Sequence, residues 1–329
     1  MRKFYNIKMD ILAITSIILG SIVGAGFSTG QEVFYFFTRF NGNSFIYIFI
    51  SCIIIYFVLK IFIQIDINNK FNKKIVKLYT LIFSFVSLSV MFSAFSQIGQ
   101  EIFGINKIVF GLICFSISIL IYLQGLTGIM SVNKIIMFFM IFLTISLAIF
   151  SINKVNISFK LDLNLIENMK WPIIYSSFNS IICLPIILRL RERYHKKTIN
   201  ISISIATCII FLLIQLINAS IFSNSLSIDK SMPLIEISKN TVYEKPLLIC
   251  MSLEILTTIL SNYIGIYYSS PSSKIGNYLL LTALFVGFFD FKDVLRNLYT
   301  IIGYMGVPLI IILSVQVLSN NIHNNNNQS

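Results

Sequence analysis

Few residues of this chain place a reactive side chain in apolar sequence, and Glu254 is the clearest case. It follows Pro246 by eight residues, which puts it about 12 Å into a helix at ~1.5 Å per residue. Polar residues recur from it at helical spacing as far as Gly265, namely Thr257, Thr258, Ser261 and Asn262. A carboxyl group there is costly, so this stripe predicts a buried site for a proton or a cation. Structural hydrogen bonding to a neighbouring helix is the alternative.

A second group of candidate residues surrounds four glycines in a long apolar segment: Gly20, Gly24, Gly26 and Gly30. Small residues at this spacing can let helices pack closely. The residues that follow, however, contain Ser28-x-x-Gln31 and Thr29-x-x-Glu32, two capping-box patterns that indicate a helix start. A start here requires that the preceding helix has ended. The free N–H groups around 27–29 would then suit a carboxylate, and the free carbonyls around 20–23 would suit a cation.

A third polar group lies in the stretch YSSFNS, residues 175–180, which Pro185 follows. Hydroxyl and amide side chains ahead of a proline predict a second broken helix, with a continuous proline-containing helix as the alternative. Glu32 has two interpretations, the capping partner of Thr29 or a working charge. Polar residues of a third apolar segment either line a path or bond neighbouring helices; they are Ser84, Ser87, Ser93, Ser96, Gln97 and Gln100.

Apolar segments make up almost the whole chain, and they are the elements that must position these groups. Of 329 residues, 56% are hydrophobic and 12% charged, and the mean hydropathy is +0.85. A soluble core could not bury so much apolar sequence, so we expect one all-α integral membrane domain over residues 1–329. About 20 apolar residues span a bilayer. Ten spans are expected, at 9–39 (interrupted), 44–64, 77–100, 107–124, 133–152, 171–188, 199–222, 246–269, 275–290 and 297–318.

The basic residues predict the orientation of the chain. The formal net charge is +12, but the Lys and Arg residues lie in loops and not in a stripe with aromatic residues. This distribution favours cytoplasmic loops and argues against nucleic-acid binding. The densest clusters, within 70–77 and 189–197, are both inside if the N-terminus is inside. We expect a multi-pass plasma-membrane protein with both termini cytoplasmic and a disordered tail over 320–329.

Side chains for other kinds of chemistry are scarce. The five cysteines lie in apolar segments without C-x-x-C spacing, and neither His195 nor His323 has a partner pattern. No nucleophile with a base and no phosphate-binding loop can be recognised. We therefore expect no enzyme activity, no cofactor, and no metal beyond a sodium ion.

Four stretches together carry a resemblance to a known family: IVGAGFSTGQE, YSSFNS, GLTGIMSVNK and LYTIIGYMG. They resemble the YkvI family of amino-acid permeases, within the amino acid, polyamine and organocation transporter superfamily. The resemblance covers about residues 9–318 and implies a LeuT-type fold. That fold has two inverted five-helix repeats, here about 9–152 and 171–318, with the first and sixth helices broken at the centre.

The resemblance also implies roles for single residues. In sodium-coupled relatives one ion is held by carbonyls before the first break and by three positions of the eighth helix. The matching residues here are Gly20, Val23, Glu254, Thr257 and Thr258. Because Glu254 puts a carboxylic acid where relatives use a carbonyl, Na⁺ and H⁺ both remain candidates for the coupling ion. Glu32 and Ser261 are further candidates for ion coupling.

We therefore expect a secondary transporter of amino acids or related small zwitterions, driven by Na⁺ or H⁺ through alternating access. The expected substrate site comprises Gly24, Ala25, Gly26, Phe27, Ser28, Thr29, Tyr175, Ser176, Ser177 and Asn179. The alternative is a membrane sensor of the same fold, similar to germinant-receptor subunits, which binds a small solute without transport. The expected partners are a small solute and the lipid bilayer, and the sequence gives no sign of the oligomeric state.

Overall fold

The first expected span is divided into short helices at the centre of the molecule. The computed structural model describes residues 7–65, 70–124, 129–152, 166–224 and 230–326. Within them the chain begins with α1 (Ile7–Ile22), α2 (Ala25–Ser28) and α3 (Gln31–Phe36), followed by the 3-10 helix η1 (Thr38–Asn43). This confirms the expected interruption of the first span.

Each of the other expected spans coincides with one helix in the described residues. These helices are α4 (Ser44–Phe62), α5 (Lys70–Phe103), α6 (Lys107–Gln124), α7 (Ile129–Ile152), α8 (Lys170–Arg191), α9 (Lys196–Phe222), α11 (Glu244–Ser269), α12 (Ser273–Val286) and α13 (Phe291–Asn326). A short helix, α10 (Pro233–Ser238), lies between α9 and α11. In this part of the chain, six helices are long and apolar enough to cross a membrane. The all-helical, multi-pass architecture therefore agrees with the sequence.

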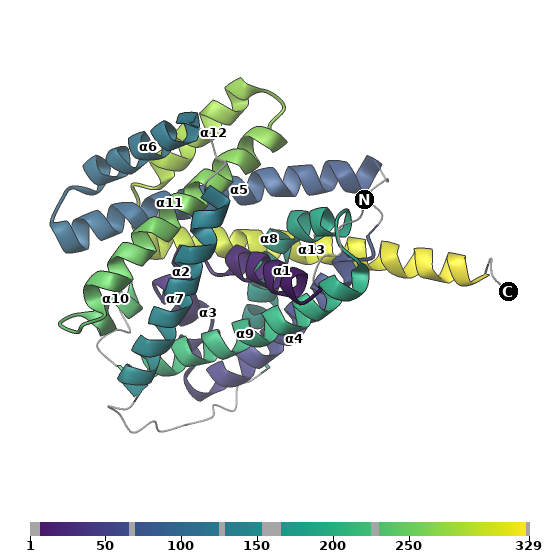
Figure 1. Cartoon of the computed structure of the whole chain (residues 1–329), viewed down its shortest axis with the longest axis horizontal. Coiled ribbons are helices and arrows are strands. Elements are labelled where there is room, and N and C mark those ends of the chain that lie inside the picture. The colour runs from purple at the N-terminus through teal and green to yellow at the C-terminus, as the bar shows by residue number, and fades with distance from the viewer. Residues whose placement is uncertain (1–6, 66–69, 125–128, 153–165, 225–229, 327–329) are drawn as a thin grey trace.

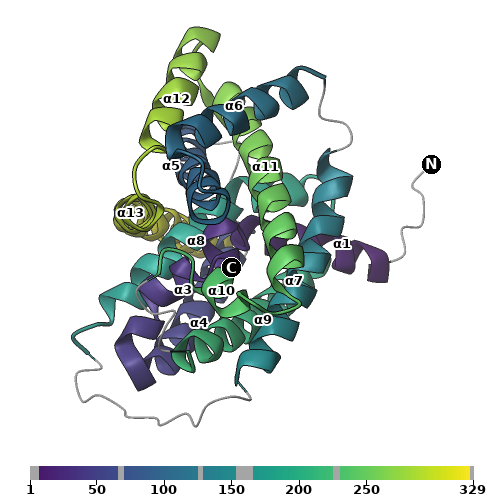
Figure 2. The same ribbon diagram turned by 90° about the vertical axis from the view of Figure 1, so that its left-hand side faces the viewer.

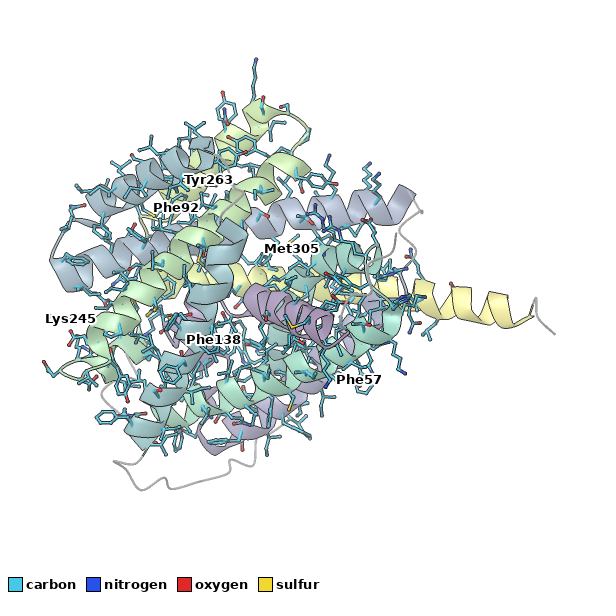
Figure 3. The ribbon with its side chains drawn as sticks, in the orientation of Figure 1. Phe57, Phe92, Phe138, Lys245, Tyr263 and Met305 are labelled. Atoms are coloured by element: carbon cyan, nitrogen blue, oxygen red, sulfur yellow. The ribbon has the colours of Figure 1, made fainter. Side chains whose placement is uncertain are left out.

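Large apolar side chains cover the outer surface, while polar ones are buried. Phe57 is 58% exposed and Phe138 is 71% exposed, and both are labelled in Figure 3. The carboxyl-bearing residues Glu32 and Glu254 are only 2% and 3% exposed. A soluble monomer rarely exposes so much contiguous apolar surface. Lipid on the outside and polar groups between the helices account for this distribution.

The broken first span and α8 lie at the middle of the bundle. Figures 1 and 2 both place α6 and α12 together on one side of the molecule and α4 and α9 on the opposite side. α8 packs against α4 and α13, and α1 packs against α9 and α8. α2 reaches α5 and α11. The interrupted backbone is therefore surrounded by other helices, as the sequence requires of non-helical backbone at membrane depth.

The expected break in the sixth span is wrong, because α8 is a continuous helix through the polar stretch and through Pro185. The polar side chains bond carbonyls of their own helix. Ser176 Oγ donates to the Pro172 carbonyl at 2.6 Å, and Asn179 Nδ2 donates to the Tyr175 carbonyl at 3.1 Å. Both bonds reach back four residues, a pattern that an intact helix accommodates. The alternative, a helix with an internal proline, is the one that forms.

The C-terminal end of the chain also differs from the expectation. The sequence predicts a disordered tail over 320–329. In the structure α13 continues as far as Asn326, and residues 327–329 lie outside the described residues. Extending an existing helix fixes only one residue for each added hydrogen bond. The long apolar helix that precedes the Asn-rich residues therefore carries the helical conformation into them.

Candidate functional site

The chain leaves the helical conformation twice within the first span. Val23 and Gly24 separate α1 from α2, and Thr29 and Gly30 separate α2 from α3. Among the described residues, no backbone N–H donates to the carbonyl of Gly20 or of Val23. These two carbonyls are the positions that the resemblance assigns to a cation. Their free lone pairs are available for such a ligand.

The second interruption has a structural cause. Gly30 has φ of 79°, a left-handed conformation that strains residues with a side chain. A Cβ at Gly30 would also lie 2.9 Å from Leu234 Cγ and 3.1 Å from Ile221 Cδ1. The Thr29 carbonyl, which the interruption would leave free, accepts a hydrogen bond from Leu234 N–H at 2.9 Å. α10 therefore satisfies the carbonyl that the second interruption would leave free.

α3 does not begin with either of the two expected capping boxes. Its N-cap residue is Gly30, which offers no side chain. Thr29 Oγ1 accepts from Gln31 N–H at 3.3 Å and donates to the Gly26 carbonyl at 3.1 Å. Thr29 thus stabilises the turn, whereas the Glu32 carboxyl lies toward α8. The capping interpretation of Glu32 is wrong.

A hydrogen bond joins the first break to α11. Ser28 Oγ lies 2.5 Å from Glu254 Oε2, and the two residues are 226 positions apart in the sequence. The same hydroxyl lies 3.1 Å from the Gly24 carbonyl. A hydroxyl has one proton, so it donates to one of these acceptors at a time. Ser28 is 1% exposed, and the contact is enclosed. The carboxyl that helical spacing singled out therefore lies against the break.

The polar stripe that begins at Glu254 divides along α11. Thr257 is buried and donates to the Glu254 carbonyl at 3.0 Å, and Thr258 is half-buried. Ser261 is exposed and bonds the Thr257 carbonyl of its own helix. Asn262 Nδ2 donates to Ser87 Oγ of α5 at 2.9 Å. Only the start of the stripe therefore reaches the break, and its far end holds α11 to α5.

Glu32 lies where α3 meets α8 and α13. Tyr175 and Asn179, one turn apart on α8, face its carboxyl group, as does Tyr299 of α13. Gly26 lies on the remaining side, where a Cβ would be 2.8 Å from Glu32 Oε2. Glu32 Oε1 and Tyr175 Oη are buried without a hydrogen-bond partner. The expected residues Tyr175 and Asn179 are therefore brought to the broken span.

Ser176 and Ser177, which lie between Tyr175 and Asn179 in the sequence, face other helices. Ser176 Oγ bonds the Ser51 carbonyl of α4 at 3.0 Å. Ser177 Oγ lies against Gly306 of α13. Because consecutive residues of a helix are rotated by about 100°, the adjacent polar residues of YSSFNS cannot all face one neighbour. The polar residues of α8 that were expected in one site therefore make three separate contacts: with Glu32, with α4 and with α13.

The polar residues of α5 bond and pack against neighbouring helices. Besides the bond from Asn262 to Ser87, Ser93 Oγ donates to the Phe289 carbonyl at 2.8 Å. Ser84 lies against Gly265, and Ser96 lies against Gly111. Of the two interpretations of these residues, helix packing is the one that their contacts support.

An arginine enclosed by aromatic rings was missed at the sequence level. The Arg39 guanidinium carbon lies 4.1 Å from the ring centroids of both Tyr35 and Trp171, and 4.7 Å from that of Phe40. We call these four residues the arginine cluster. Tyr35 and Arg39 are four residues apart, the spacing of side chains on one helix face, which was the available signal. The cluster joins the segment after α3 to the start of α8.

The comparisons with known proteins address the fold. No protein-family model matches the chain, and no curated protein matches its sequence. In the described residues, no three His, Cys, Asp or Glu side chains gather as metal ligands. The structure is similar to the crystal structure of a mutant manganese transporter from Eremococcus coleocola, with a TM-score of 0.53 and 13% identity over 95% of this chain and 80% of that one. The chain therefore has the fold of a membrane transporter.

Proposed function

We propose that this protein is an ion-coupled secondary transporter of amino acids or related small zwitterions that works by alternating access. The observation that carries the proposal is the interrupted first span, with free carbonyls and with the buried Glu254 carboxyl bonded to Ser28 beside it. Broken spans with this combination of groups hold substrates and ions in secondary transporters. The shared fold with a solved transporter supports the same class of function.

Two inverted five-helix repeats account for how the helices pack. We assign α1–α3, α4, α5, α6 and α7 to one repeat, and α8, α9, α11, α12 and α13 to the other. In this assignment α1–α3 correspond to α8, α4 to α9, α5 to α11, α6 to α12 and α7 to α13. With this pairing, the packing of α4 on α8 corresponds to that of α9 on α1. The same pairing relates α5 with α6 to α11 with α12, and α7 with α11 to α13 with α5. This correspondence supports the LeuT-type architecture that the resemblance implies.

The site residues divide into two groups in this proposal. The substrate carboxylate binds backbone N–H groups of the segment from Gly24 to Thr29 other than that of Ser28, which donates to the Gly24 carbonyl. Tyr175 and Asn179 of α8 contribute from the other side, whereas Ser177 packs against α13. Ser176, bonded to α4, supports α8. The coupling ion, Na⁺ or H⁺, binds at Glu254 with Thr257 and Thr258, close to the carbonyls of Gly20 and Val23. The protein lies in the plasma membrane with both termini in the cytoplasm.

Uptake into proteoliposomes tests the proposal. A panel of radiolabelled amino acids is offered under an imposed Na⁺ or pH gradient, and one gradient should drive accumulation of at least one of them. Glu254→Gln should abolish gradient-driven accumulation. Ser28→Ala should weaken it by roughly ten- to a hundredfold, because a hydrogen bond to a charged group is worth roughly 1.5–3 kcal/mol.

Ser16→Ala is the matched control, since Ser16 lies on α1 and, within the described residues, its hydroxyl bonds only the Leu12 carbonyl of the same helix. This variant should transport like the wild type. If no amino acid accumulates under either gradient, the proposal fails. Ligand-induced thermal stabilisation without any flux would point to a sensor of the same fold.

A further inference from the structure

Glu32 is a second buried carboxyl at the broken span, and the transport scheme above gives it no task. It is 2% exposed and takes part in no ion pair among the described residues. Its neighbours on α8 and α13, Tyr175, Asn179 and Tyr299, carry only neutral polar groups. An ionised carboxylate in such a setting has no cation to balance it.

Aromatic rings pack together at the contact of α3, α8 and α13, where Glu32 lies. Phe36 and Phe178 lie 5.5 Å apart between ring centroids, and Tyr175 lies 5.4 Å and 5.3 Å from them respectively. Tyr299 continues the cluster at 4.8 Å from Phe178. At this contact Glu32 is only 2% exposed. The smallest cation, a proton, needs no further space or ligands in such a setting.

Glu32 and Glu254 belong to different contacts. Glu254 meets the broken span through Ser28 of α2. Glu32 projects from α3 onto α8, with Oε1 and the facing Tyr175 Oη both lacking a partner. A phenol beside a carboxyl can donate to it or accept from it. The pair can therefore form a hydrogen bond in either protonation state of the carboxyl.

The groups that could balance a charge on Glu32 lie elsewhere. Arg39 of η1 and Arg296 of α13 lie over the Tyr35 ring, at 4.1 Å and 5.6 Å. Glu236 of α10 pairs with Lys239 at 2.6 Å. α2 carries no titratable side chain, and α9 has its lysines only in its first turn. Tyr175 and Tyr299 are thus the titratable groups that face Glu32.

We propose that Glu32 is a proton-binding site, with Tyr175 and Asn179 facing its carboxyl, and that its proton is coupled to substrate movement in addition to the ion at Glu254. The binding step forms one O–H bond on the carboxylate and needs no other reactant. The coupling role rests on the proposed transport function, whereas the proton site itself does not. A transporter with this site takes up or releases a proton at α3 each time the broken span changes its exposure from one side of the membrane to the opposite side.

Infrared spectroscopy of the purified protein in lipid tests the proton site without any need for flux. The wild type should show the carbonyl band of a buried protonated carboxylic acid, which Glu32→Gln removes. Tyr175→Phe should shift that band without removing it, because the acid loses the phenol that can hydrogen-bond to it. Glu101→Gln, which changes an exposed acid on α5, is the control and should leave the band unchanged. The same band in Glu32→Gln as in the wild type, at every pH, overturns the proposal.

A transport assay then tests coupling with the same variants. Glu32→Gln should keep exchange of labelled for unlabelled substrate but lose the stimulation of uptake by a pH gradient. Stimulation equal to that of the wild type would overturn the coupling role. If the wild type moves no substrate while Glu32→Gln still removes the band, the transport function fails and the proton site stands.

Discussion

The glycines of the broken span differ in the physical reason for which a glycine is needed, although they look alike in the sequence. Gly30 combines a left-handed backbone with close contact to α10, and Gly26 leaves room for the Glu32 carboxyl. Gly24 has space, since a Cβ there would meet its nearest neighbour, Met91 Cε, only at 3.9 Å. Gly30 therefore serves the fold, and Gly26 serves the buried acid beside it.

Gly30→Ala should destabilise the protein more than Gly104→Ala. Both positions have positive φ, 79° and 63°, and a side chain in that region costs about 1–2 kcal/mol. Gly104 has nothing within 4 Å of an added Cβ, so it isolates the backbone strain. Thermal unfolding of the two purified variants measures the difference. Equal losses in Tm would mean that contact with Leu234 contributes nothing.

At the scale of elements, the contact of α8 with α13 is as close as backbone allows. A Cβ at Gly303 would lie 2.7 Å from the Ile174 carbonyl oxygen, and one at Gly306 would run into Ser177 and Ile181. Close approach through small residues is how membrane helices gain packing energy. The contact holds α13, and with it Tyr299, next to Tyr175 and Glu32.

Gly303→Ala should separate these two helices and destabilise the protein by about 1–3 kcal/mol, the usual cost of overpacking. The obstacle is backbone, which cannot rotate away as a side chain can. Gly24→Ala is the control, because its methyl group has room. Thermal unfolding of the two purified variants should give a lower Tm for Gly303→Ala. Equal Tm values would show that α8 and α13 can move apart freely.

At the scale of the whole molecule, the distribution of basic residues predicts which loops face the cytoplasm, and this orientation in the membrane can be tested. Arg193 and Asn106 are both exposed, and they lie in loops expected on opposite sides of the membrane. With both termini inside, a membrane-impermeant maleimide added to intact cells should label Asn106→Cys and spare Arg193→Cys. Both should react after the membrane is opened. Labelling of Arg193→Cys in intact cells would reverse the orientation.

Apolar length predicted the spans well, because each one needs about 20 residues and has few other ways to satisfy its backbone. The first break could be predicted from clustered glycines followed by two capping-box patterns; the break is present, although α3 begins at Gly30 without a side-chain cap. The sixth could not, since serine and asparagine can bond their own helix as easily as interrupt it. Spacing also singled out Glu254, but its partner Ser28, 226 residues away, becomes visible only when the helices are packed.

One contact described above links distant parts of the molecule. The hydrogen bond from Leu234 to the Thr29 carbonyl ties α10, which lies between two spans, to the interior of the first span. Four of the six residues of α10 are buried, namely Pro233, Leu234, Ile235 and Ser238, so this helix is itself anchored in the molecule. A movement of the centre of the first span would therefore have to break this bond or carry α10 with it.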